Sequence, residues 1–242
     1  MTLVLAVAAG ALIGLSLGAL GGGGSILAVP VLVYLLDQSP AQATTGSLVV
    51  VGTTALIGAI AAHRDGNVLL GRGAGFGVVA IGGAVIGAKA SAHVDGDVLL
   101  GAFAALMLLV GALMAWRLLH HRGAAAQHPV RPTLDHPIIT FSPTFACQCP
   151  RALKVLVTAT VVGLLTGFLG VGGGFLVVPA LLLALALPLP YAAGTSLVVI
   201  TITSAAALAT RAGVGSTPDW GDFLVLTRAS ATAADAGARL AD

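Results

Sequence analysis

Two glycine-rich stretches in the sequence have the composition of backbone sites that hold anions. The first reads GGGGSILAVP from position 21, and the second reads GVGGGFLVVP from position 170. Glycine has no side chain, so its backbone takes unusual dihedral angles and its N–H groups stay uncovered. A helix that begins just after such a stretch points its free N–H groups and the positive end of its dipole at the stretch. Both stretches therefore predict an anion site.

Hydroxyl side chains form a second repeated pattern, TTGS at 44–47 and AGTS at 193–196. Such hydroxyls cap a helix, bond back to the preceding turn, or donate to a bound oxyanion. Small residues also let membrane helices pack closely, so capping and packing are the alternative interpretations. We interpret the glycines and hydroxyls together as substrate-binding candidates: Gly21, Gly22, Gly23, Gly24, Ser25, Thr45, Ser47, Gly170, Gly172, Gly173, Gly174, Thr195 and Ser196.

The sequence contains no residue pattern that indicates an enzyme. The glycine stretches lack the following Lys-Ser/Thr of a phosphate-binding P-loop, and no nucleophile is paired with a histidine in an apolar segment. Four histidines share residues 120–150 with Cys147 and Cys149, but their spacing matches no zinc pattern. We therefore expect neither catalysis, nor a cofactor, nor a metal site.

The composition requires a surface that faces lipid. Hydrophobic residues make up 57% of the chain and charged residues 8%, whereas a soluble domain has about 25% charged residues. In lipid every backbone polar group needs an internal partner, and the long apolar runs do not alternate as barrel strands do. The fold class is therefore an all-α integral membrane protein, a polytopic helix bundle in the lipid bilayer. The net charge of +2 does not favour nucleic acid.

The apolar runs predict membrane helices, and the glycine stretches predict breaks between them. Residues 3–36 as one helix would be about 50 Å long, against a hydrocarbon core of about 30 Å. A break at residues 21–24 resembles the discontinuous helices with which secondary transporters hold substrates near the midplane. The predicted apolar segments are 3–20, 26–36, 41–62, 73–92, 97–119, 152–169, 175–187 and 190–210.

The chain is an internal duplication. Pro30 aligns with Pro179 and Ser47 with Ser196, both at an offset of 149 residues, and the neighbouring glycines follow the same register. Whether the two repeats are parallel or inverted is left open by the sequence. The predicted domains are a first membrane repeat, a polar linker and an incomplete second membrane repeat, at 1–119, 120–150 and 151–242.

The charges predict an orientation. The linker and its flanks carry five Lys and Arg residues against one acid, and the loop at Arg64 and the region of its counterpart near Arg211 are basic too. The positive-inside rule then places all of them in the cytoplasm, with a cytoplasmic N-terminus, in a multi-pass protein of the cell inner or plasma membrane. The last segment, 219–242, contains Arg228 and Asp235, and we expect it not to span the bilayer independently.

The motifs GALGGGGSILAVP with TTGSL, and GFLGVGGGFLVVP with GTSLVV, resemble the sulfite exporter TauE/SafE family of membrane permeases. The resemblance implies about eight helices and transport of small anions, such as sulfite, sulfonates or related organic anions. It also implies that the two glycine stretches and the hydroxyl-bearing helix starts form the substrate region. The incomplete second repeat supports an alternative, a degenerate or non-transporting membrane module of the same family.

Overall fold

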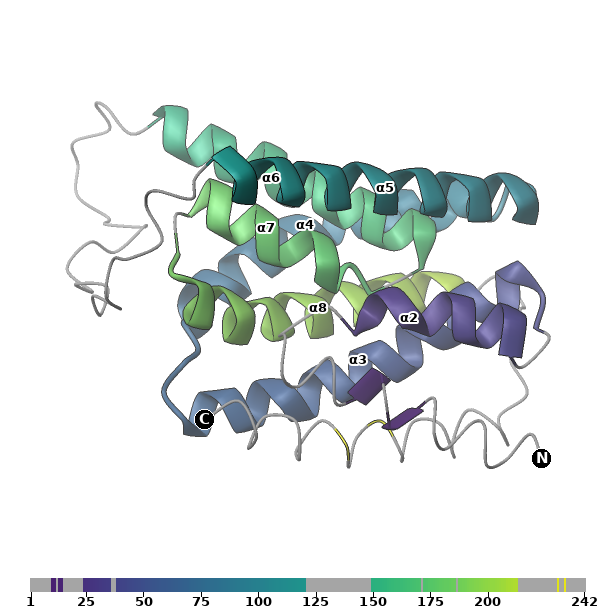
Figure 1. Ribbon diagram of the computed structural model, residues 1–242, viewed down its shortest axis with the longest axis horizontal. Helices are drawn as coiled ribbons and strands as arrows, with labels where there is room; N and C mark the ends of the chain where they lie inside the picture. Colours follow the sequence, from purple (N-terminus) through teal and green to yellow (C-terminus); the bar gives the residue numbers. More distant parts are fainter. Residues whose placement is uncertain are drawn as a thin grey trace.

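The structure, a computed structural model, describes residues 10, 11, 13, 14, 24–35, 38–120, 149–170, 172–185, 187–212, 230 and 233. These residues are helical or lie in short connections, and no strand occurs in the described ranges. The elements are α2 (Ser25–Pro30), η1 (Val31–Leu35), α3 (Pro40–Arg64), α4 (Leu70–Ser91), α5 (Gly96–His120), α6 (Cys149–Leu169), α7 (Gly174–Ala184) and α8 (Leu189–Ala212), as shown in Figure 1. They confirm the predicted segments from 26–36 to 190–210. Segment 3–20 lies mostly outside the described residues.

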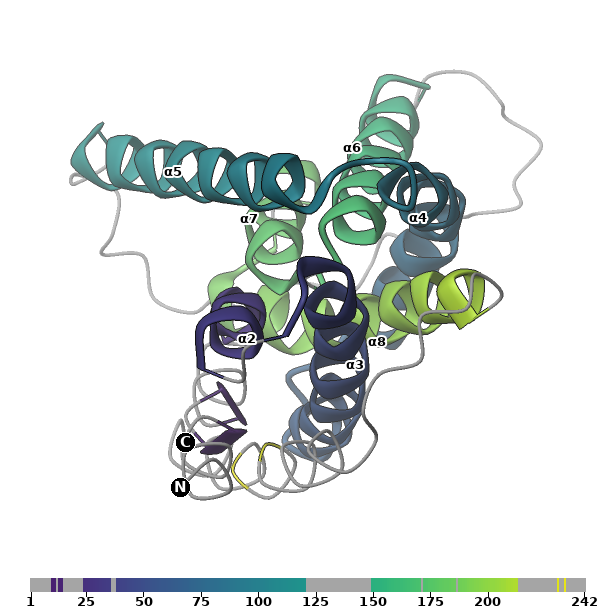
Figure 2. The same cartoon turned by 90° about the vertical axis from the view of Figure 1, so that its right-hand side faces the viewer.

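Four of these helices are long and apolar enough to cross a membrane, namely Pro40–Arg64, Leu70–Ser91, Gly96–Leu113 and Tyr191–Arg211. The apolar side chains of α5 are largely uncovered by protein: Leu108 is 76% exposed and Leu109 is 65% exposed. In Figure 2, α5 lies at the edge of the bundle, so its surface is left for lipid. The chain is therefore an all-helical, multi-pass membrane protein.

Proline marks the junction of α2 with η1, and a polar cap marks the start of α3. Pro30 ends the regular turns of α2, and the wider π-helix η1 follows it, because proline has no N–H for the ordinary helical bond. Ser39 caps α3: its hydroxyl accepts from the Gln42 N–H at 3.4 Å, and the Gln42 side chain accepts in return from the Ser39 N–H. This cap fixes the start of α3, where the hydroxyl residues of the first repeat lie.

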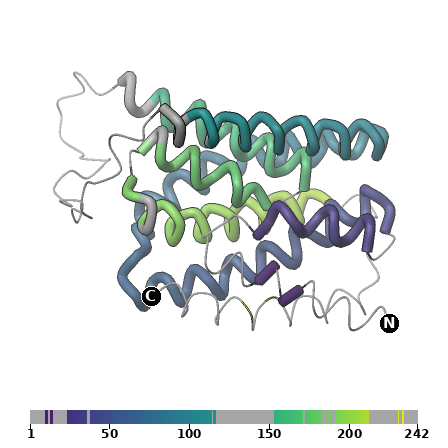
Figure 3. Tube along the Cα trace, in the orientation of Figure 1, coloured from purple at the N-terminus to yellow at the C-terminus, as the bar shows by residue number. Residues whose placement is uncertain are grey.

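Helices α3 and α8 run antiparallel through the centre of the molecule. Arg211 at the end of α8 contacts Thr44 at the start of α3, while Thr195 at the start of α8 accepts a hydrogen bond from Leu69, just after α3. Both helices can be followed in Figure 3. Residues 40 and 189, where α3 and α8 begin, differ by the 149 positions of the sequence offset, as do residues 25 and 174, where α2 and α7 begin. Helices α3 and α8, which the sequence pairs at this offset, thus run in opposite directions.

The opposite directions of α3 and α8 correct one sequence expectation. The sequence places Arg64 and Arg211 on the same side of the membrane, because they occupy comparable positions in the two repeats. In the structure Arg64 ends α3 and Arg211 ends α8, and the two helices are antiparallel, so the two arginines lie at opposite ends of the molecule. Arg211 instead shares its end with the loop that carries Asp95.

Helices α4 and α6 cross at four glycines, Gly83, Gly87, Gly163 and Gly167, which we call the α4–α6 crossing. A methyl group at Gly167 would overlap the backbone carbonyl of Ala84, and one at Gly87 would overlap a carbonyl of α6. Each helix thus packs directly on the backbone of the other, as small-residue motifs allow in membranes. The crossing holds α6 in place, and the second glycine stretch follows directly at its end.

Of segment 219–242 the structure describes Ser230 and Ala233, both helical. The Ser230 side chain is fully buried, and its carbonyl lies where a methyl group at Gly14 would be. Arg228 and Asp235, on which the prediction for this segment rests, lie outside the described residues.

Candidate functional site

The second glycine stretch interrupts the helix, as the sequence predicts. Helix α6 ends at Leu169 and α7 begins at Gly174, and the connection at 170–173, which we call the 170–173 break, contains three glycines with positive φ. Gly170, Gly172 and Gly173 have φ of 66°, 69° and 67°. A residue with a side chain is disfavoured in this left-handed region, which explains why the turn is built from glycine.

The break extends from the start of α3 to its middle: a methyl group at Gly170 would overlap Thr44, in the first turns of α3. A methyl group at Gly172 would overlap the Val51 side chain of α3 and would lie 3.4 Å from Ser204 Oγ of α8. Val51 is about 16 Å along α3, whose 25 residues span about 37 Å, so the break reaches the middle of a membrane-crossing helix. Irregular backbone is tolerated at such a depth where protein covers it or where it lines a cavity.

Two buried hydroxyls face the break without a hydrogen-bond partner. Thr166 Oγ1 of α6 lies directly against Gly173, and Ser204 Oγ lies against Gly172. Each residue is 1% exposed, and neither hydroxyl oxygen has a hydrogen-bond partner among the residues that the structure describes. A buried polar group without a partner lowers the stability of the fold by about 1–3 kcal/mol. A purely structural role therefore does not explain these two hydroxyls.

The start of α7 adds donors of its own. Gly173 accepts from the N–H groups of Leu176 and Val177 at 2.9 and 2.8 Å, so the helical ladder begins there. The N–H groups of the first turn precede this ladder, and the positive end of the α7 dipole points at the break. Hydroxyls, free N–H groups and a helix dipole together form a neutral set of donors that suits an anion.

The predicted site residues do not gather at one place in the structure. Ser47 Oγ donates a hydrogen bond to the carbonyl of Gly170, so α3 is tied to the 170–173 break. Thr45 lies beside Arg211 instead, at the end of the bundle, and Thr195 Oγ1 accepts from the Leu69 N–H at 3.1 Å.

The remaining predicted residues mostly lie at helix starts. Ser196 Oγ donates to the carbonyl of Ala193 at 2.6 Å, a bond within its own helix. Gly174 is the first residue of α7, Gly24 precedes α2, and Ser25 is fully buried at the start of α2. Gly21, Gly22 and Gly23 lie outside the described residues, so the structure gives the geometry of the second glycine stretch and only the end of the first.

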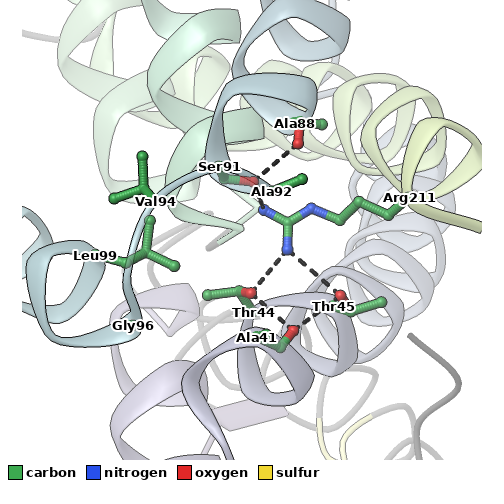
Figure 4. Close-up of a pocket in the computed structure, with 10 residues that line it drawn as sticks. All are labelled: Ala41, Thr44, Thr45, Ala88, Ser91, Ala92, Val94, Gly96, Leu99 and Arg211. Atoms are coloured by element: carbon green, nitrogen blue, oxygen red, sulfur yellow. Dashed lines mark hydrogen bonds between the residues drawn. The ribbon is translucent and has the colours of Figure 1, made fainter. Parts of the chain in front are cut away.

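A buried arginine lies near the break. Arg211 is 8% exposed, and Figure 4 shows its guanidinium between Ser91 of α4 and the two threonines at the start of α3. It lines a cavity of about 190 Å³, which we call the Arg211 pocket, together with Ala41, Thr44, Thr45, Ala88, Ser91, Ala92, Val94, Gly96 and Leu99.

Sequence reasoning missed Thr166, Ser204 and Arg211. The sequence places Arg211 in a basic loop, but the residue lies in the last turn of the apolar helix α8. A charged residue within a membrane helix is itself a candidate for a functional site. Ser204 precedes it by seven residues and therefore shares its face of α8, a spacing that the sequence does contain. Thr166 is one hydroxyl among many in apolar helices, and its sequence context does not distinguish it.

The helical architecture and this broken helix define a polytopic membrane protein with a buried polar site. The chain belongs to the family described as "Sulfite exporter TauE/SafE", which it matches over residues 6–242. Its curated relatives include two proteins named "Probable membrane transporter protein" from Xylella fastidiosa, strains Temecula1 and 9a5c. Both are 36% identical to it, over 184 and 185 residues that cover 76% of this chain. The chain spans 64% of the length of these relatives. No solved structure matches it.

Among the residues that the structure describes, no three His, Cys, Asp or Glu side chains gather as metal ligands would. The linker histidines and both cysteines lie mostly outside these residues, Cys149 being the first residue of α6.

Proposed function

We propose that this chain is a secondary permease for a small anion, such as sulfite, a sulfonate or a related organic anion. The observation that carries the proposal is the 170–173 break, which reaches the middle of α3, with two buried hydroxyls that have no partner among the described residues. The names of the relatives and the family description support it. The driving gradient comes from the membrane, because the sequence contains no nucleotide-binding motif.

The proposed site binds an anion without a fixed positive charge. Thr166 and Ser204 donate their hydroxyl protons to oxyanion oxygens, and the first N–H groups of α7 add charge through the helix dipole. The glycines leave no side chain between the backbone and the substrate. A neutral donor set holds an anion and also releases it, as a transport cycle requires.

The proposed orientation keeps the linker 120–150 in the cytoplasm. The Arg211 end of the bundle, opposite Arg64, then faces the outside. The acidic turn at Asp95 and Asp97 faces the outside with it, in accord with the positive-inside rule.

The test is flux in proteoliposomes across a panel of sulfite, sulfonates and carboxylates. Thr166→Val and Ser204→Ala each remove a hydroxyl that has no partner, so we expect the free energy of unfolding to stay unchanged or to rise. We expect each variant to lower flux about tenfold or more, because a hydrogen bond to a charged group contributes about 1.5–3 kcal/mol. Thr203→Val is the matched control, since this buried hydroxyl bonds to the Val199 carbonyl of its own helix.

Wild-type flux in both variants would show that the break is not the substrate site. A wild-type chain that carries none of the panel would favour the alternative, a non-transporting module of the family. Labelling of Cys147 and Cys149 with a membrane-impermeant thiol reagent in right-side-out vesicles checks the orientation, and rapid labelling of intact vesicles would contradict it.

A further inference from the structure

Arg211 is a buried cation whose contacts are all neutral. Its Nη1 donates to the Thr44 hydroxyl at 2.7 Å and to the Thr45 hydroxyl at 3.4 Å. Its Nη2 donates to the Ser91 hydroxyl and the Gly167 carbonyl, both at 2.9 Å, and to the Phe168 carbonyl at 3.4 Å. These partners come from three other helices, α3, α4 and α6, and Nε has no partner in the described ranges of the chain.

Neutral partners do not balance a buried charge. Removing a guanidinium from water costs several kcal/mol, and buried charges in proteins are therefore paired or bind ions. In the described part of the chain, all five hydrogen bonds of Arg211 end on hydroxyl or carbonyl oxygens, and no carboxylate is among them. The cluster fixes the guanidinium in place but supplies no counter-ion from the described residues.

The space beside the guanidinium is large enough for a small oxyanion. The Arg211 pocket has a volume of about 190 Å³, whereas one water takes about 30 Å³ of liquid. Hydroxyls of Thr44, Thr45 and Ser91 line it together with the arginine, and Ala41 and Ala92 are exposed at its rim. Figure 4 shows Val94 and Leu99 on the side of the pocket opposite the arginine stem.

We propose that the Arg211 pocket is a second anion-binding site, which takes a small oxyanion such as a sulfite, sulfonate or carboxylate group. The positive charge of the guanidinium attracts such a group. The three hydroxyls accept from Arg211 and donate to the carbonyls of Ala41 and Ala88, and they turn these protons to the oxygens of the anion. The anion supplies the negative charge that the protein partners of Arg211 lack.

The pocket also lies on a path to the 170–173 break. Ser204 and Arg211 are seven residues apart on α8, so they share a face about 10 Å apart along the axis. Thr44, which Arg211 contacts, also lies against Gly170. An anion bound at Arg211 therefore lies next to the break and its two hydroxyls. This path rests on the proposed transport function, whereas binding at Arg211 does not.

The experiment measures binding of sulfite and of methanesulfonate to the full chain in lipid nanodiscs by calorimetry. We expect Arg211→Gln to weaken binding at this site about tenfold or more, and Arg211→Lys to weaken it less, because lysine keeps the charge but loses the paired donors. Arg64→Gln is the control, since Arg64 is an exposed cation at the opposite end. In Thr166→Val, Ser204→Ala protein the Arg211 site should still bind.

A pocket-filling variant separates lost binding from lost structure. Ala92 is exposed at the rim, so Ala92→Leu narrows the pocket and leaves Arg211 with all its hydrogen bonds. We expect the same weakened binding. Normal affinity in Ala92→Leu or in Arg211→Gln overturns the second site. Binding at Arg211 in a chain that carries no anion across the membrane would refute the proposed transport and leave this site standing.

Discussion

The α4–α6 crossing and the 170–173 break are both built from glycine and follow one another along the chain, but their glycines face different neighbours. At the crossing the glycines lie within regular helix, and a methyl group on any of them would meet a backbone carbonyl. At the break the glycines have positive φ. A methyl group on Gly172 or Gly173 would meet a side chain, Val51 or Thr166, and one on Gly170 would meet both the side chain and the carbonyl of Thr44.

This difference separates two uses of glycine that look alike in a sequence. A crossing brings two backbones together and leaves no space between them, so it stabilises the bundle. A break turns the backbone away from the helix and exposes its polar groups to whatever lies beside it, here two hydroxyls without partners. Close packing describes the glycines of the crossing, whereas we propose that the glycines of the break serve binding.

The largest effect is expected at the crossing. In Gly167→Ala the new methyl group overlaps the Ala84 carbonyl, and no side chain can move to make room, so α4 and α6 must separate. We expect a loss of at least about 3 kcal/mol in the free energy of unfolding, and little folded protein in the membrane. Gly101→Ala on α5 is the control, because a methyl group there meets nothing within 4 Å. Thermal unfolding in detergent measures both, and equal stability of the two variants would contradict the crossing.

A smaller loss of stability is expected at the break, and a second substitution should restore part of it. Gly172→Ala forces alanine to a φ of 69°, at a cost of about 1–2 kcal/mol, and adds the overlap with Val51. Val51→Ala in the same chain removes the overlap but not the strain. The double variant should therefore recover part of the stability that the single variant loses, while flux stays low because the backbone of the break is altered.

A double-mutant cycle on unfolding temperatures measures this recovery. Full recovery of stability would mean that the positive φ carries no strain, and no recovery would mean that Val51 does not limit the space. Neither outcome fits the break as described. The crossing allows no comparable rescue, since its obstructing atoms are backbone.

The sequence was sufficient for the helices and for the position of the break. Long uncharged runs decide where membrane helices lie, because lipid excludes unpaired backbone, and glycine clusters mark where such a helix cannot continue. The predicted ends 169 and 175 differ by at most one residue from the bounds of α6 and α7. The direction of α8 relative to α3 could not be predicted, because it depends on how many segments cross the membrane between these two helices.

The partners of the site could not be predicted either, because they come from helices far apart in the sequence. Ser204 and Thr166 meet at the break only because α6 is held against α4 and α8 runs antiparallel to α3. The hydroxyl that the sequence favoured in the first repeat, Ser47, reaches the break from the other repeat and holds its backbone there. Motif repetition indicates the region of the proposed site, and tertiary packing decides which of its hydroxyls lack a partner among the described residues.

The smallest effect is expected at the tie between α3 and the break. Ser47 Oγ donates to the Gly170 carbonyl and also lies 3.0 Å from the carbonyl of Thr44 in its own helix. Ser47→Ala removes the bond to Gly170 and leaves that buried carbonyl without this donor, so we expect a loss of about 1 kcal/mol in the free energy of unfolding. Thr53→Val, on the same helix, removes a hydroxyl that bonds only to carbonyls of its own preceding turn, and should change stability by a few tenths of a kcal/mol. Chemical unfolding of both variants in the same detergent measures the difference. If Ser47→Ala proves no less stable than Thr53→Val, the positive-φ glycines hold the break by themselves and the contact with α3 adds nothing to it.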